Sequence, residues 1–196
     1  MDGEFFQSKF HNILNIIFLK CYKSIRASNK IFRERLLYYK ILSKNHKSLV
    51  DYGVIFRFNN SCYWLRRWRR GTFLLNNNLN STHLEQAVDK LISIHNLTLP
   101  AKILNDLKNS KDVISWYDAQ SKTSFFEEWK KLKKKHSETN CLVHGDFQPK
   151  KHLLVKEKQV EIIDFGDSFW GQPSVDLGAL ACSNPEIFDD FFKLYN

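Results

Sequence analysis

The sequence predicts an α+β fold in which a smaller, strand-rich part precedes a larger, mainly helical part. Apolar runs of strand type dominate the first third of the chain, at 15–23 and 54–68. Helical periodicity follows from residue 82 onwards. Short apolar runs then indicate a small sheet inside the helical part, at 141–143, 152–155 and 160–164. We therefore expect two lobes, residues 1–72 and 73–196, with the stretch 71–80 as the hinge between them.

In the smaller part, the run NIIFLKCYK (15–23) predicts a strand with a basic end. Residues 30–42 carry Phe32, Leu36 and Tyr39 at helical spacing, which indicates a helix with one apolar face. The runs VIFRFNN and CYWLRRW lie on either side of an Asn-Asn-Ser turn, so they predict a β-hairpin over 54–68.

The larger part contains two candidate capping boxes, in which a Ser or Thr and a later Glu satisfy the first amides of a helix. Thr82 and Glu85 open the first helix, whose apolar stripe ends near His95. Ser124 and Glu127 open the second, which ends in a run of lysines that suits the helix dipole. A third helix is expected from Pro185 onwards.

The composition of the chain narrows its environment and partners. The 196 residues carry a net charge of +9, which is compatible with a nucleic acid, an acidic membrane surface or a polyanionic small ligand. The four cysteines are widely separated, which favours reduced thiols. The apolar stretch 13–19 is too short to cross a bilayer, and no secretory signal is visible. We therefore expect a cytoplasmic protein without a transmembrane segment.

Two aspartates end apolar runs near the C-terminal end of the chain. Asp146 follows CLV and His144-Gly145, and Asp164 follows Ile162-Ile163 and precedes Phe165-Gly166. Buried carboxylates at strand ends are costly unless a cation meets them. Paired carboxylates suit Mg²⁺, which accompanies phosphates, and one carboxylate can instead receive the proton of an attacking hydroxyl. The pair therefore predicts phosphoryl transfer.

The segments HGDFQPKKHLLV and IIDFGDSFWGQPSVDLGAL resemble the signatures of the aminoglycoside phosphotransferase and choline kinase-like family, which has a protein-kinase-like fold. The resemblance implies that Asp146 is the catalytic base and that His144 holds its loop. It also implies that Asp164 is the principal metal ligand and that Asp176 braces the loop. Each motif alone is weak, but their order and spacing are specific.

The same resemblance gives roles to residues of the smaller part. Kinases orient the α- and β-phosphates with a strand lysine paired to a helix glutamate, and Lys20 and Glu34 occupy matching positions, with Lys23 as the alternative lysine. Both are also everyday surface residues. The segment after the hairpin, including Arg67 and Trp68, is expected to face the adenine.

The sequence departs from the family pattern in three places. Gapless alignment puts Lys151 where the family has a metal-binding Asn, whereas one inserted residue puts His152 there; a neutral imidazole can ligate, so we favour His152. The short N-terminus predicts either an abbreviated phosphate-covering loop at 8–12 or a missing first strand. The C-terminus is also short, so the acceptor site is expected to be truncated, completed by another chain, or built from the segment 101–140, where we would look for a substrate wall.

Together these features predict an ATP- and Mg²⁺-dependent phosphotransferase that modifies a hydroxyl of an aminoglycoside-, amino-alcohol- or sugar-like small molecule. The alternative is a pseudokinase or truncated remnant that serves as a nucleotide-binding or interaction module. The basic clusters RRWRR and KKLKKKH leave a third interpretation, nucleic-acid binding, which we disfavour because such runs are most often solvated faces.

Overall fold

The structure is a computed structural model that describes residues 6–10, 17–22, 34–37, 54–59, 61–67, 71–74, 80–108, 139–156 and 158–196. The chain divides into two compact units, Met1–Arg70 and Gly71–Asn196. The nucleotide-binding and catalytic roles expected of residues 1–72 and 73–196 remain predictions.

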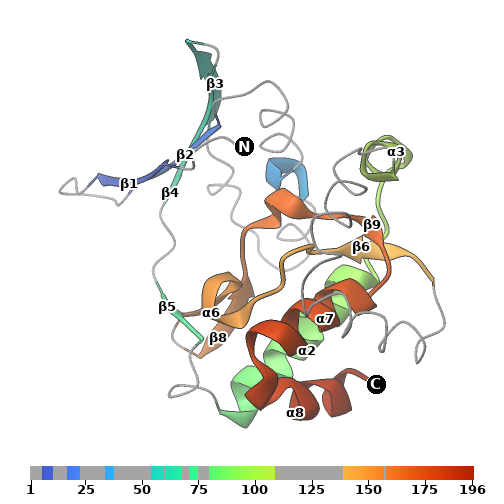
Figure 1. Cartoon of the computed structure of the whole chain (residues 1–196). Helices are drawn as coiled ribbons and strands as arrows, with labels where there is room; N and C mark the ends of the chain where they lie inside the picture. The colour runs from blue at the N-terminus through green and yellow to red at the C-terminus, as the bar shows by residue number, and fades with distance from the viewer. Residues whose placement is uncertain are drawn as a thin grey trace. The chain divides into compact units, whose positions relative to one another are not determined.

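The N-terminal unit contains a four-stranded antiparallel sheet in the order β1-β2-β4-β3 (Figure 1). Its strands are β1 (Phe6–Phe10), β2 (Ile17–Tyr22), β3 (Val54–Phe58) and β4 (Ser61–Arg67). The predicted hairpin is confirmed, and Asn59 in its turn adopts a positive φ of 46°, which asparagine tolerates well.

We predicted either a missing first strand or a loop over 8–12. Both predictions are wrong for residues 6–10, the part of this stretch that the structure describes. Residues 6–10 form β1, and Ser8 lies opposite Leu19 of β2. The run FQSKF is short and half polar, so it carries little strand signal; pairing with β2 satisfies its backbone groups.

Buried side chains of the N-terminal unit come from β4 and from the short helical segment 34–37. Cys62 and Trp64 are two residues apart and therefore lie on one face of β4, where both are buried. Leu37 and Glu34 are also fully buried. Of the helix predicted over 30–42, residues 34–37 lie within the described residues and are helical.

The C-terminal unit combines two small sheets with helices. One sheet has the order β5-β7-β8, and the other pairs β6 with β9. The strands are β5 (Thr72–Phe73), β6 (Cys141–Val143), β7 (Leu153–Lys156), β8 (Gln159–Ile162) and β9 (Phe169–Gly171). The helices are α2 (Ser81–His95), α3 (Ala101–Lys108), α6 (Pro149–His152), α7 (Ser174–Ser183) and α8 (Pro185–Tyr195), with a 3-10 turn, η3, at Phe165–Asp167.

Helix α2 forms as its apolar stripe predicts, but its N-cap differs from the expected capping box. Asn80, two residues before Thr82, caps the helix, and its side-chain oxygen accepts the backbone N–H of His83 at 2.8 Å. The stripe buries Leu84, Val88 and Leu91. The helix ends at His95, as predicted.

Packing of α2 positions the strands that carry the candidate site. It contacts β8, β6 and α8, and α7 contacts α8 (Figure 1). Gln86 of α2 also binds the β7–β8 hairpin: its side chain donates to the carbonyl of Lys158 and accepts the N–H of Val160, both at 3.0 Å. The rigid helix therefore holds the strand that leads to Asp164.

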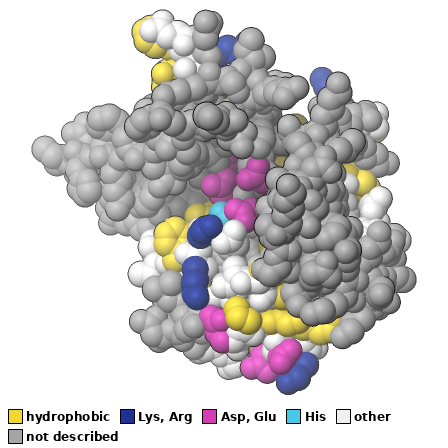
Figure 2. All heavy atoms as spheres, in the orientation of Figure 1, with side chains coloured by type: hydrophobic (Ala, Val, Ile, Leu, Met, Phe, Trp, Pro, Cys, Tyr) yellow, Lys and Arg dark blue, Asp and Glu magenta, His cyan; other side chains and the backbone are white. Residues whose placement is uncertain are grey.

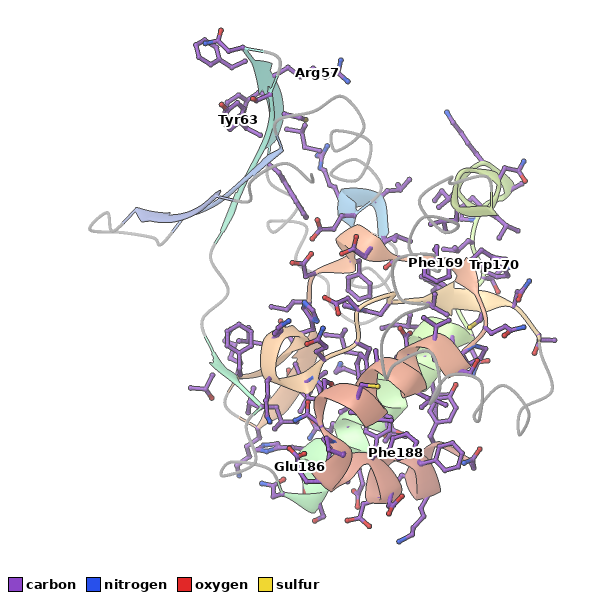
Figure 3. All side chains as sticks on the ribbon, in the orientation of Figure 1. Arg57, Tyr63, Phe169, Trp170, Glu186 and Phe188 are labelled. Atoms are coloured by element: carbon purple, nitrogen blue, oxygen red, sulfur yellow. The ribbon has the colours of Figure 1, made fainter. Side chains whose placement is uncertain are left out.

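Side chains at the edges of this unit follow ordinary surface and packing rules. Phe169 and Trp170 extend from β9, which contacts α3, and Glu186 and Phe188 lie on α8 (Figure 3). Acidic and basic side chains adjoin over the region of α6 and α8 in Figure 2, in agreement with the ion pairs Lys150–Glu186 and Lys193–Asp190, both at 3.4 Å.

Among the described residues, no helix is long and apolar enough to cross a membrane. The helix predicted from Ser124 lies outside the described residues.

Candidate active site

The candidate site begins where β6 ends. All three residues of β6 are buried, and the chain then turns at Gly145 with φ +86°. A Cβ atom at this position would lie 2.3 Å from the carbonyl oxygen of Asp167, which is backbone and cannot move aside. Only glycine fits both the backbone conformation and this contact. The HGD segment and the DFGD segment therefore touch through their backbones.

Asp176, near the start of α7, binds the HGD loop with both oxygens of its carboxylate. Oδ2 accepts the backbone N–H of His144 at 2.7 Å, and Oδ1 accepts that of Gly145 at 2.9 Å. The carboxylate is fully buried. Together these two bonds hold the loop backbone at a fixed place relative to α7.

His144 links the HGD loop to the residue before Asp164. Its Nε2 lies 2.8 Å from the carbonyl oxygen of Ile163, which can only accept, so Nε2 carries the proton. Its Nδ1 then accepts the backbone N–H of Asp146, at 3.4 Å. Ser168 adds a further link, since its hydroxyl donates to the carbonyl of His144 at 3.3 Å. His144 itself is fully buried, so its hydrogen bonds hold the loop from inside the protein.

The carboxylate of Asp146 is accessible yet held in place. Its side chain is 38% exposed. Oδ1 accepts a hydrogen bond from the amide of Gln148, and Oδ2 lies 3.9 Å from Nε2 of His152. A carboxylate with a restricted orientation and a solvent-facing side is suited to receive a proton from a bound hydroxyl.

His152 is buried, whereas the adjacent Lys151 is exposed. It is the last residue of α6, a single turn that opens with Pro149. Burial lowers the pKa of His152 to about 4, and the neighbouring His144 adds to this effect. The imidazole is therefore neutral at physiological pH, and among the described residues its Nδ1 has no hydrogen-bond partner. A neutral imidazole with a free nitrogen is a competent metal ligand.

Asp164 is placed by an unusual backbone conformation between β8 and η3. It adopts φ 66° and ψ 69°, a left-handed conformation that is uncommon for residues other than Gly, Asn and Asp. The preceding N–H, that of Ile163, donates to the carbonyl of His152 at 2.9 Å. The charges of Asp146 and Asp164 both act on His152, where they partly offset the lowering of its pKa. The two carboxylates thus lie in the same neighbourhood.

The carboxylates of this neighbourhood are ligands of the kind that Mg²⁺ uses, together with water and substrate phosphates. Across the described residues, no group of three or more His, Cys, Asp or Glu side chains is arranged to hold a metal ion. Mg²⁺ is usually bound through one or two carboxylates together with water and substrate phosphates. Asp164, whose charge acts on the neighbouring His152, could supply such a carboxylate.

The predicted residues of the N-terminal unit are placed only in part. Lys20 lies in β2 and Arg67 ends β4, but their side chains lie outside the described residues, as does Trp68. Glu34 is described and fully buried on the helical segment 34–37. The pairing of Lys20 with Glu34 and the adenine contact therefore remain predictions.

Sequence reasoning missed three residues that contact the site: Gln148, Ser168 and His95. His95 carried a usable signal, since it continues the stripe of Leu84, Val88 and Leu91 and is buried with it. A polar side chain at an apolar position of a helix indicates a buried hydrogen bond. Its Nε2 lies 3.0 Å from Asp176. Gln148 and Ser168 carried no such signal.

Comparison with solved structures shows which known folds this one resembles. The fold is similar to that of the spectinomycin phosphotransferase APH(9)-Ia in complex with ADP and spectinomycin, with a TM-score of 0.66 and 16% identity, covering 100% of this chain and 71% of that chain. It is also similar to APH(2'')-IIa in a ternary complex with streptomycin and ATP, with a TM-score of 0.63 and 14% identity over 97% of this chain and 77% of that one. An amicoumacin kinase in complex with AMP-PNP, Ca²⁺ and Ami gives a TM-score of 0.61 and 14% identity over 100% and 69% of the two chains.

Residues 50–195 match the sequence profile of the phosphotransferase enzyme family, APH. The chain belongs to this family. No curated protein sequence matches it significantly. The resemblance stated from the HGD and DFGD segments is therefore confirmed, and the α+β fold is that of aminoglycoside phosphotransferases.

Proposed function

We propose that the protein transfers the γ-phosphoryl group of ATP to a hydroxyl of a small molecule. The observation that carries this proposal is the joined geometry of the HGD and DFGD segments. Asp176 binds the loop before Asp146, and His144 binds the residue before Asp164. Two acidic groups are thus fixed near one buried neutral imidazole, His152.

In this proposal Asp146 is the catalytic base. It orients the acceptor hydroxyl and takes its proton as the hydroxyl oxygen bonds to the γ-phosphorus and the bond to ADP breaks. Asp164 and His152 hold Mg²⁺, which neutralises phosphate charge when bound. Lys20, Glu34, Arg67 and Trp68 serve the nucleotide. Most of the rate acceleration comes from positioning and charge neutralisation.

The acceptor is a small molecule that carries a hydroxyl group. Similar structures include complexes with spectinomycin and with streptomycin, and an amicoumacin kinase, which supports an antibiotic or another amino-alcohol or sugar. The net charge of +9 argues against the most cationic aminoglycosides, whose binding favours an acidic pocket. We therefore place hydroxyl compounds with few amino groups before the most cationic aminoglycosides.

The proposal is tested with γ-labelled ATP and Mg²⁺ against a panel that contains spectinomycin, streptomycin, amicoumacin, choline and simple sugars. We expect label to move to at least one acceptor, and to none in the Asp146→Ala variant. Equal labelling by the wild type and by Asp146→Ala would show that the base is assigned wrongly.

A nucleotide-binding pseudokinase is the second candidate. The hydrogen bond from the Gln148 amide to the Asp146 carboxylate favours it, because that oxygen is already occupied and is not open to an acceptor hydroxyl. This candidate predicts stabilisation by ATP with Mg²⁺ without transfer to any acceptor. Absence of thermal stabilisation at millimolar ATP and Mg²⁺ would exclude both nucleotide-dependent functions.

A further inference from the structure

A chain of buried hydrogen bonds leads from the last helix to the HGD loop. Tyr195 of α8 places its hydroxyl 2.5 Å from Nδ1 of His95, the last residue of α2. Nε2 of the same ring lies 3.0 Å from Oδ2 of Asp176, the oxygen that accepts the backbone N–H of His144. The side chain of His95 is 4% exposed and that of Asp176 is 0% exposed.

The chemistry of the groups sets the direction of the bond to Asp176. Two backbone N–H groups already donate to the Asp176 carboxylate, whose oxygens act as acceptors, so Nε2 of His95 is the donor in its contact with Oδ2. In the Nε2–H tautomer Nδ1 is an acceptor, and the Tyr195 hydroxyl can donate to it. Burial raises the pKa of Tyr195, with Cys141 and Asp176 adding to the effect, so the hydroxyl keeps the proton that it donates.

We propose that Tyr195 and His95 are positioning residues for the loop that carries Asp146. Their effect on catalysis rests on the proposed function. Tyr195 holds His95 in the tautomer that donates to Asp176. The other tautomer would turn a lone pair toward the carboxylate and weaken its hold on the amides of His144 and Gly145.

The experiment measures hydrogen exchange at the amides of His144 and Gly145 in the full chain, together with the ¹⁵N resonances of the His95 ring. Tyr195→Phe removes only the hydroxyl. His95→Gln keeps an N–H donor for Asp176, whereas His95→Leu removes it. Tyr63→Phe is the matched control, because it removes a tyrosine hydroxyl in the N-terminal unit, where Tyr63 stacks on Phe56.

We expect the wild-type ring to be the Nε2–H tautomer and Tyr195→Phe to shift its Nδ1 resonance. Loss of one hydrogen bond in the chain should speed exchange at His144 and Gly145 by about 3- to 10-fold. His95→Leu should act at least as strongly, His95→Gln should restore part of the protection, and Tyr63→Phe should change nothing.

Exchange at His144 and Gly145 that is the same in wild type and Tyr195→Phe would overturn the inference, as would an Nδ1–H tautomer in the wild type. Because Tyr195→Phe keeps the ring, this result does not depend on whether His95→Leu folds. The exchange readout requires no turnover. If Tyr195→Phe speeds exchange but the wild-type protein transfers no phosphoryl group, the positioning role stands and the proposed function is rejected.

Discussion

The imidazole of His144 donates from Nε2 to the carbonyl oxygen of Ile163 at 2.8 Å. This bond joins the residue two positions before Asp146 to the residue immediately before Asp164. The two loops that carry the acidic groups are therefore joined through one buried ring. Such coupling preorganises a site before its ligands bind.

Replacement of Asp164 by Asn should remove Mg²⁺-dependent nucleotide binding while preserving the fold. Asparagine tolerates the left-handed conformation of this position, whereas alanine would add strain. We expect the affinity for ATP in the presence of Mg²⁺ to fall by at least about 10-fold, or about 1.4 kcal/mol, by titration calorimetry. Asp189→Asn, an exposed change on α8, is the control. Unchanged affinity in Asp164→Asn would reject its role as metal ligand.

Replacement of Asp146 by Asn should spare nucleotide binding and stop turnover. The amide keeps the shape of the side chain but cannot accept the hydroxyl proton, so we expect kcat to fall by about 10²- to 10⁴-fold. The measurement pairs calorimetry of nucleotide binding with a product assay. A variant that turns over at the wild-type rate would show that another group is the base.

Replacement of Asp176 by Asn should destabilise the C-terminal unit. One side-chain oxygen would remain for two backbone N–H groups, and the new NH₂ group would face a donor. We expect the free energy of unfolding in urea to fall by about 2–4 kcal/mol. Asp190→Asn is the matched control: its carboxylate is 72% exposed and pairs with Lys193. Its loss should cost no more than about 0.5 kcal/mol. Equal effects of the two changes would contradict the brace.

The cysteines should differ sharply in reactivity. Burial, with the nearby Asp176, raises the pKa of Cys141 to about 12, so this thiol remains protonated near neutral pH. Because the thiolate is the reactive form, iodoacetamide at pH 8 should leave Cys141 unmodified and alkylate the exposed Cys182. Mass spectrometry of the native protein tests this. Rapid alkylation of Cys141 would show that the strand beneath the HGD loop opens readily.

The sequence predicted the elements whose signal is local. The apolar runs of β6 and β8 and the stripe of α2 appear where periodicity places them. It did not predict β1, because a short mixed strand becomes stable only when it pairs with β2. The cap at Asn80 was missed because several polar residues there can serve as caps, and backbone geometry decides among them.

The candidate site was predictable where a motif orders its residues and not where contacts are distant in sequence. Asp146, Asp164 and Asp176 stand out because each belongs to a specific segment. The links from His95 and Tyr195 to Asp176 depend on how α2, α7 and α8 pack, which no local pattern encodes. His152 was preferred over Lys151 from the strand pattern. The structure buries His152 and exposes Lys151, although the metal role itself remains a prediction.

A crystal structure of the protein with Mg²⁺ and a non-hydrolysable ATP analogue tests the central claim most directly. We expect the metal on the carboxylate of Asp164, with His152 beside it, and the γ-phosphate facing Asp146. A nucleotide bound elsewhere, or a metal that contacts neither Asp164 nor the phosphates, would contradict the assignment of a phosphotransferase site to these residues.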